Sequence, residues 1–141
     1  MNTNHMDIKF AESLLDIYIQ NVVKILDSNF GVDHAENTMF DAISLLSDYS
    51  ELKPIFLKKV ADTFAIRSRD AFDYNTIPED FIELCAHELR WSELLELAEE
   101  RVKTFFRGDI TLAAGDVSSS IRDAYDDKWT DRMFYRRYNE K

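Results

Sequence analysis

Cysteine, glycine and proline are scarce in this sequence, and each shortage argues against a class of structure. The chain has a single cysteine, Cys85, so it cannot form an internal disulfide framework. Three glycines and two prolines leave few positions for tight hairpins, which argues against a sandwich or barrel of many short strands. Long apolar runs are lacking too, because Asp16, Lys24 and Asp27 interrupt the longest one. We therefore expect a reduced, cytoplasmic protein without a membrane-spanning or targeting segment.

The sequence does contain enough apolar material for one folded domain. Hydrophobic residues make up 45% of the chain and aromatic residues 13%, which is far more than a disordered acidic tail would contain. A chain of 141 residues can also bury a core without the help of disulfides or metal. We expect a single domain, residues 1–141, of the all-α class and without a cofactor.

Apolar residues recur every three or four positions along most of the chain, which predicts a series of amphipathic helices. The first expected helix covers residues 8–26, and we predict that it lies at the centre of the fold. Gly31 is expected to end it in a left-handed conformation. Asp33 and Glu36 have the spacing of a capping box, which predicts the start of the second helix.

The third and fourth helices are predicted from their start signals. Proline is tolerated only near a helix start, so the third helix is expected to begin within a turn of Pro54 and to run towards Phe72. Thr76 and Glu79 have the spacing of a capping box and Pro78 lies between them, which predicts the start of the fourth helix.

The remaining third of the chain contains one helix, a long break and a tail. Ser92 is expected to cap a fifth helix that ends at Gly108. The residues between Gly108 and Asp116 have no helical period and are predicted to form an ordered loop. Helical spacing resumes near Ser118 as one helix or two short ones. Six to seven helices joined by short turns predict either a compact bundle or a short HEAT-like stack.

Residue types with catalytic or metal-binding potential do not have the spacing that such chemistry requires. His87 and Glu88 begin the helical motif of zinc proteases, but the second histidine of that motif is replaced by Trp91. Cys85 lies two residues from His87 and thus on a different helix face, so we interpret it as a small buried hydrophobic residue. The three glycines are too dispersed for a phosphate-binding loop. We expect neither a metal site nor enzymatic activity.

The strongest functional feature is an acidic stretch in residues 79–100. This stretch contains eight acidic residues and one basic residue, Arg90, in a chain with a net charge of −10. Like charges at helical neighbour spacing repel by roughly 0.2–0.5 kcal/mol per pair, so stability alone does not explain them. A solvated face that keeps the protein soluble is one interpretation. The other, which we favour, is a docking face for a basic protein, formed by Glu79, Asp80, Glu83, Glu88, Trp91, Glu93, Glu96, Glu99 and Glu100.

The C-terminal tail interleaves basic and aromatic residues, a pattern that is found in nucleic-acid-binding segments. Residues 122–141 include six basic residues, but five acidic residues nearly neutralise them. The rest of the chain is acidic and would repel a phosphate backbone. We therefore expect no nucleic-acid binding, and we expect the tail to fold onto the domain with its basic residues near the domain's acids.

A run of residues before and within the fourth helix carries a family resemblance. It consists of Ile77, Pro78, Glu79, Asp80, Phe81, Ile82 and Glu83, followed by His87, Glu88, Leu89, Arg90 and Trp91. This run resembles small helical bacterial proteins encoded beside toxin genes, which include the immunity proteins of contact-dependent and polymorphic toxin systems. The resemblance implies a cytoplasmic protein that binds one cognate toxin domain and blocks its active site or substrate surface. It implies no catalytic residues.

Charge is consistent with what the resemblance implies. Nuclease toxins bind a polyanion and present basic surfaces, which clustered carboxylates can occupy. The sequence therefore predicts an immunity protein that inhibits a basic, nucleic-acid-degrading toxin. The alternative is a non-catalytic helical adaptor or scaffold subunit of a larger assembly, which we would expect to expose a broad apolar groove.

Overall fold

The computed structural model describes residues 7–68, 70 and 76–139. All regular structure in these residues is helical, which confirms the predicted all-α class. The elements are α1 (Ile8–Asp27), α2 (Val32–Asp48), α3 (Leu52–Phe64), α4 (Glu79–Leu89), α5 (Ser92–Phe106), α6 (Val117–Asp123), the 3-10 helix η2 (Thr130–Phe134) and α7 (Arg136–Asn139). Among them, no helix combines the length and the apolar character needed to span a membrane.

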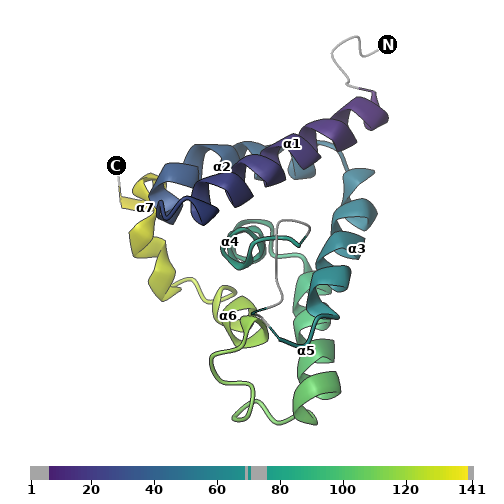
Figure 1. Ribbon diagram of the computed structural model, residues 1–141, viewed down its shortest axis with the longest axis vertical. Helices are drawn as coiled ribbons and strands as arrows, with labels where there is room; N and C mark the ends of the chain where they lie inside the picture. Colours follow the sequence, from purple (N-terminus) through teal and green to yellow (C-terminus); the bar gives the residue numbers. More distant parts are fainter. Residues whose placement is uncertain (1–6, 69, 71–75, 140–141) are drawn as a thin grey trace.

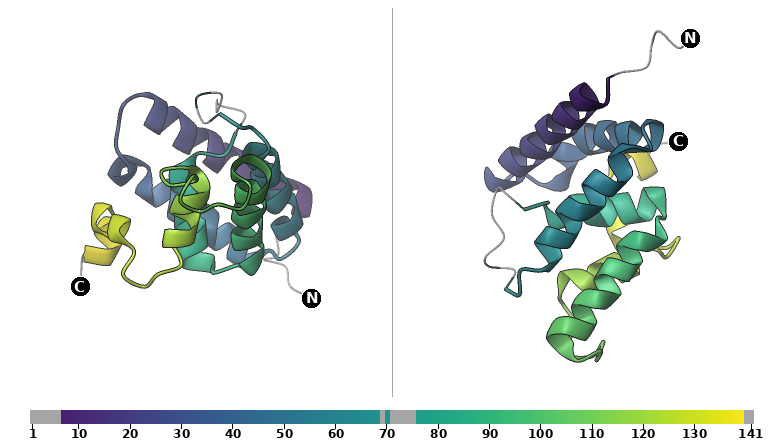
Figure 2. Two further views of the ribbon diagram at one scale, coloured as in Figure 1. Left: turned by 90° about the horizontal axis from the view of Figure 1, so that it is seen from below. Right: turned by 90° about the vertical axis from the view of Figure 1, so that its right-hand side faces the viewer.

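The helices surround α4. In Figure 1, α1 and α2 lie side by side across one end of the molecule, α3 and α5 form one flank, and α6 lies below α4. The tail with η2 and α7 runs back up the opposite flank towards α2, and the right-hand view of Figure 2 shows its end beside α2. Because the helices pack around one central member instead of adding in successive pairs, the arrangement is a bundle and not a HEAT-like stack.

The central position of α4 corrects our expectation for the first helix. Every residue from 81 to 87 in α4 is buried, including the polar Glu83 and His87. α1 buries a single stripe instead, formed by Ala11, Leu15, Ile19, Val22 and Val23. A helix that is apolar on most of its circumference belongs in the interior, whereas a helix with one apolar stripe covers the core from outside.

The turn between α1 and α2 differs from the prediction in the residue that is left-handed. Asn29 adopts the left-handed conformation with φ 70°, whereas Gly31 has φ −79° and occupies the N-cap position of α2. Asp33 lies within the first turn of α2, so it does not cap the helix. Glu36 is buried and binds the C-terminal segment, so the predicted capping box is wrong.

Three predicted helix limits also need correction. α3 begins near Pro54 as predicted but ends at Phe64, and Phe72 lies outside the described residues. α4 begins at Glu79 with Pro78 as N-cap, so Thr76 is not the capping residue. A helix capped by Thr76 would need Ile77 in the helical conformation, which is disfavoured for a residue directly before proline. Ser92 is the first residue of α5, and Trp91 occupies its N-cap position.

The apolar residues at helical spacing face the core, as predicted for amphipathic helices. Met39, Ile43 and Leu46 of α2 and Phe56, Val60 and Phe64 of α3 are buried there. The predicted end of the fifth helix is also confirmed. Arg107 and Gly108 end α5 in left-handed conformations, with φ 56° and 77°. A loop without regular helix follows, and helical structure resumes at Val117.

A buried arginine in the middle of α5 joins three elements. Arg101 forms two bonds with the carboxylate of Asp116, from Nε at 2.8 Å and from Nη2 at 3.0 Å. Its other three donors reach the carbonyl oxygens of Phe64, Ile66 and Arg67 at 2.6–2.9 Å. All five N–H donors of the guanidinium group are therefore used. Arg101 thus satisfies carbonyls at the end of α3 and fixes the N-cap residue of α6.

The tail folds onto the domain as predicted, but through other contacts than we expected. The Glu36 carboxylate accepts the backbone N–H groups of Arg136 and Arg137 at 2.8 and 2.9 Å. The guanidinium group of Arg137 lies 3.8 Å from the ring centre of Phe40. The Tyr138 hydroxyl donates to the Glu88 carboxylate. The domain's acids thus bind backbone and hydroxyl groups of the tail, while this arginine stacks on an aromatic ring.

Candidate docking surface

The predicted docking residues on α4 do not form one exposed face. Glu83 is 6% exposed and lies in the interior of the bundle. Glu79 and Asp80 are half-buried at the start of the helix, and Glu88 accepts the hydrogen bond from Tyr138. Because neighbouring elements cover most of α4, only Glu88 among its acids is exposed, and Glu83 is removed from the predicted face.

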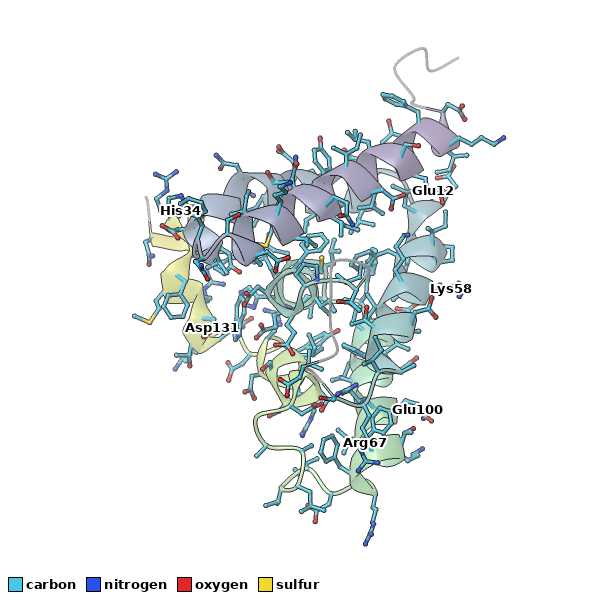
Figure 3. The ribbon with its side chains drawn as sticks, viewed as in Figure 1. Glu12, His34, Lys58, Arg67, Glu100 and Asp131 are labelled. Atoms are coloured by element: carbon cyan, nitrogen blue, oxygen red, sulfur yellow. The ribbon has the colours of Figure 1, made fainter. Side chains whose placement is uncertain are left out.

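Asp80 is held in an unfavourable environment for a carboxylate. Its burial raises the pKa of the carboxyl group, and the neighbouring charges of Glu79 and Asp131 raise it further. Asp131 belongs to the tail, which Figure 3 shows on the flank opposite α3. The acids at this end of α4 therefore repel one another across the contact between α4 and the tail.

Trp91 and Glu93 are engaged at the junction of α4 and α5. Glu93 forms an ion pair with Lys53 of α3 at 3.0 Å, and the same ammonium group lies 4.9 Å from the ring centre of Trp91. The Trp91 ring packs edge-on against Phe56, and its carbonyl oxygen accepts a hydrogen bond from the Tyr125 hydroxyl. The pKa of Glu93 is lowered by the hydrogen bond from its own backbone N–H group and by Lys53. Both residues therefore help to fix the start of α5 against α3, and Trp91 also binds the segment that follows α6.

Glu96, Glu99 and Glu100 remain together on the surface of α5, and we call them the acidic ridge. All three are exposed, and they lie opposite the buried Leu94, Ala98 and Val102 because of the helical period. Glu96 and Glu99 form no ion pair with any residue that the structure describes. Glu100 has one weak partner, Lys103 at 4.0 Å, and both side chains are largely exposed. The ridge is thus the part of the acidic stretch that remains available to a partner.

A depression of about 440 Å³ lies beside the acidic ridge. Its lining combines the three glutamates with Lys103, Ile110 and Arg122. Ile110 is 54% exposed, and Leu112 in the same loop is 61% exposed. The loop therefore displays apolar side chains next to carboxylates.

This loop is anchored at several points. The Asp109 carboxylate accepts the N–H groups of Thr111 at 2.9 Å and Leu112 at 3.3 Å. Ala113 is buried, and Asp116 at the end of the loop is bound by Arg101. A loop held in this way presents its exposed side chains with little ordering cost when a partner binds. Sequence reasoning predicted an ordered loop here, but gave no indication that it would lie beside the glutamates.

The residues with catalytic potential are used inside the core. His87 Nδ1 bonds the Ala124 carbonyl oxygen at 2.7 Å, and Nε2 contacts the Arg132 guanidinium group. Because a guanidinium group can only donate, Nε2 accepts and Nδ1 donates. Cys85 is buried as predicted, and burial raises the pKa of its thiol well above the usual value, with a further contribution from Glu88. In the described part of the chain, no three His, Cys, Asp or Glu residues gather as a metal site would require.

The arrangement on α5 suits the recognition of a basic surface. Carboxylates in a row attract cations, while apolar side chains at the edge can be desolvated on contact. Comparison of the chain with protein-family models, with curated proteins and with solved structures finds no match.

Proposed function

We propose that this protein is an immunity protein that binds a basic toxin domain with nucleic-acid-degrading activity and covers its substrate surface. The acidic ridge and the adjacent loop with Ile110 and Leu112 form the docking surface. The observation that carries the proposal is the exposure of Glu96 and Glu99 without an ion pair to any described residue, on a helix fixed by Arg101.

Two physical effects support this assignment. Clustered carboxylates steer a basic partner to the ridge and raise the association rate, an effect that salt screens. Exposed apolar side chains supply the part of the affinity that charge alone does not, because the strongest contacts in an interface are desolvated anchors. The ridge and loop place both kinds of group within one surface.

A second function, that of an adaptor subunit, is favoured by one observation on the other side of the molecule. Phe10 and Ile17 of α1 are 60% and 56% exposed. They are two helical turns apart and thus lie on the same face. If the protein is an adaptor, replacing both with serine should abolish its assembly with a larger complex, whereas substitutions in the ridge should not.

The test takes the protein encoded by the neighbouring gene as the toxin candidate. The purified chain should neutralise the nuclease activity of that protein at equimolar amounts. The triple variant Glu96→Gln, Glu99→Gln, Glu100→Gln should bind the toxin candidate with an association rate that is lower by a factor of about ten or more at low salt. This difference should shrink as salt is added.

The matched control removes the same charge elsewhere. Asp41, Asp48 and Glu51 are exposed on α2 and at the start of α3, and their replacement by Asn, Asn and Gln gives the same net charge as the ridge variant. We expect this control to neutralise like the wild type. Equal effects of the two triple variants would show that only the net charge matters and would contradict the proposed surface.

A further inference from the structure

A second depression of about 390 Å³ lies on the other side of the acidic ridge, between α3 and α5. Most of its lining is apolar. α3 contributes Ala61 and Phe64, Ala65 follows at the C-cap, and α5 contributes Leu97 and Phe105. Glu100 lines this groove as well as the depression beside Ile110. Figure 3 labels Glu100 and Arg67 on this flank.

The shape of the groove follows from the residues that form it. Ala61 and Ala65 are one turn apart, so α3 presents two small side chains on this side, and α5 presents larger ones. Arg101 lies beneath and binds three carbonyl oxygens at the end of α3, which fixes the two walls relative to each other. From Leu97 to Phe105 the groove follows α5 for roughly 12 Å, at ~1.5 Å per residue. This length accommodates about two turns of a helix.

The charges around the groove are unevenly distributed. On the α5 side Glu100 lines the groove, and Glu96 and Glu99 lie next to it along the ridge. On α3 the charges of Lys58 and Asp62 neutralise each other in an ion pair at 3.2 Å. Arg101 also lines the groove, but its charge is paired with Asp116. Two other cations lie nearby: Lys103, at 4.0 Å from Glu100, and Arg67, whose guanidinium group lies 5.8 Å from the ring centre of Phe105. An occupant with basic residues along the α5 side therefore complements the groove.

We propose that the groove between α3 and α5 receives an amphipathic helix of the partner, with apolar side chains one turn apart on one face and Lys or Arg residues beside them. The apolar face lies over Ala61, Ala65 and Leu97, and the basic residues face the acidic ridge. Recognition of amphipathic helices in apolar grooves is a common mode of protein binding. The inference rests on the proposed function, because it specifies the part of the basic partner that binds next to the ridge.

A synthetic peptide provides the first test. It is a helix of about 14 residues, or about four turns, with leucines three and four positions apart and lysines beside them. The control peptide has the leucines replaced by glutamine and the same charge. Titrated into the 15N-labelled full chain, the leucine peptide should shift the amide signals of Ala61, Ala65, Leu97 and Thr104. The affinity of the glutamine peptide should be lower by a factor of about ten or more. Shifts that spread over all acidic surfaces would overturn the proposal.

Variants of the protein provide the second test. Ala65→Lys places a long basic side chain at the exposed edge of the groove and should weaken peptide binding about tenfold, which corresponds to about 1.4 kcal/mol. Ser44→Lys adds the same charge at an exposed small residue of α2, outside the groove and the docking surface, and should leave peptide binding unchanged. Equal binding by the two variants would overturn the proposal.

Neutralisation of the toxin candidate separates this inference from the proposed function. We expect Ala65→Lys to neutralise it less well than Ser44→Lys. If Ala65→Lys loses peptide binding but neutralises like the wild type, the groove is not where the partner binds, while the proposed function stands. If the ridge variant also neutralises like the wild type, the proposed docking surface fails.

Discussion

Replacing Arg101 with methionine removes the guanidinium group that holds α3, α5 and α6 together, while it retains most of the side-chain volume. Five hydrogen bonds are lost, two of them to the Asp116 carboxylate. Asp116 keeps the backbone N–H group and the hydroxyl of Ser118, at 3.0 and 2.6 Å, but its charge is no longer compensated. The carbonyl oxygens of Phe64, Ile66 and Arg67 also lose a donor.

The expected loss of stability is large. Removing one partner of a buried ion pair costs about 3–5 kcal/mol, because the other charge remains buried without compensation. Arg101 meets this condition, with a side chain that is 0% exposed. A chain of this length is stable by about 7–20 kcal/mol, at ~0.05–0.15 kcal/mol per residue. At roughly 2–4 °C per kcal/mol, we expect Tm to fall by about 6–20 °C.

Urea and thermal denaturation followed by circular dichroism measure this effect. Arg101→Lys keeps the charge but cannot form five directed bonds, so we expect an intermediate loss. Adding Asp116→Asn to Arg101→Met removes the uncompensated charge while it leaves a capping side chain, so part of the lost stability should return. If Arg101→Met lowers the free energy of unfolding by less than about 1 kcal/mol, the reasoning is refuted, because a loss that small is expected of an exposed ion pair.

The pH dependence of stability tests the contact between Arg101 and Asp116 independently. Burial alone would raise the pKa of Asp116, but hydrogen bonds from Arg101 and Ser118 outweigh it and lower the pKa. Since the pKa is lower in the folded state, the contact stabilises the protein above the unfolded-state pKa of about 3.9. This stability is lost as the pH falls from there through the folded-state pKa. Arg101→Met should lose less stability than the wild type over the same acid range.

Two further substitutions should change the stability of the protein in opposite directions. The pKa of Asp80 is raised by burial, by Glu79 and by Asp131, so its ionisation destabilises the folded state as the pH rises above about 4. Asp80→Asn should therefore gain stability relative to the wild type between about pH 4 and pH 7 in urea denaturation, and a constant difference would contradict this cause. Glu36→Ala leaves two backbone N–H groups of α7 without their acceptor, at a cost of about 1–3 kcal/mol. Trypsin should then cleave the tail faster, as mass spectrometry would show, and an unchanged rate would contradict the role of Glu36.

Hydrophobic periodicity predicted most of the fold. Together with the start signals it located α1 to α5, and it gave the inward positions of α2 and α3, because these helices have one buried stripe each. It did not show that the fourth helix is the central one, because α4 is short and carries Glu83 and His87 among its buried residues. Periodicity records the spacing of apolar residues, and it cannot show that a polar residue will be buried with a partner from a distant segment.

The candidate surface was predicted only in part, for a related reason. Counting acids along residues 79–100 treated two helices as one face, but the fold covers α4 and leaves α5 exposed. The sequence offered no sign that Arg101 is buried, since it follows Glu99 and Glu100 in a charged run. The groove between α3 and α5 likewise has its two walls more than 30 residues apart in the sequence, so only the packed structure brings them together.

Opposite faces of α5 illustrate why the acidic ridge calls for an explanation beyond stability. The buried face supplies Leu94, Ala98 and Arg101 to the core. On the exposed face, the carboxylates of Glu96, Glu99 and Glu100 repel one another at helical neighbour spacing, by roughly 0.2–0.5 kcal/mol per pair. The ridge variant with three glutamines should therefore unfold at the same or a slightly higher urea concentration. A variant that is no less stable yet docks poorly would show the exchange of stability for binding that is expected at a functional surface. A marked loss of stability would instead mean that the glutamates serve the fold.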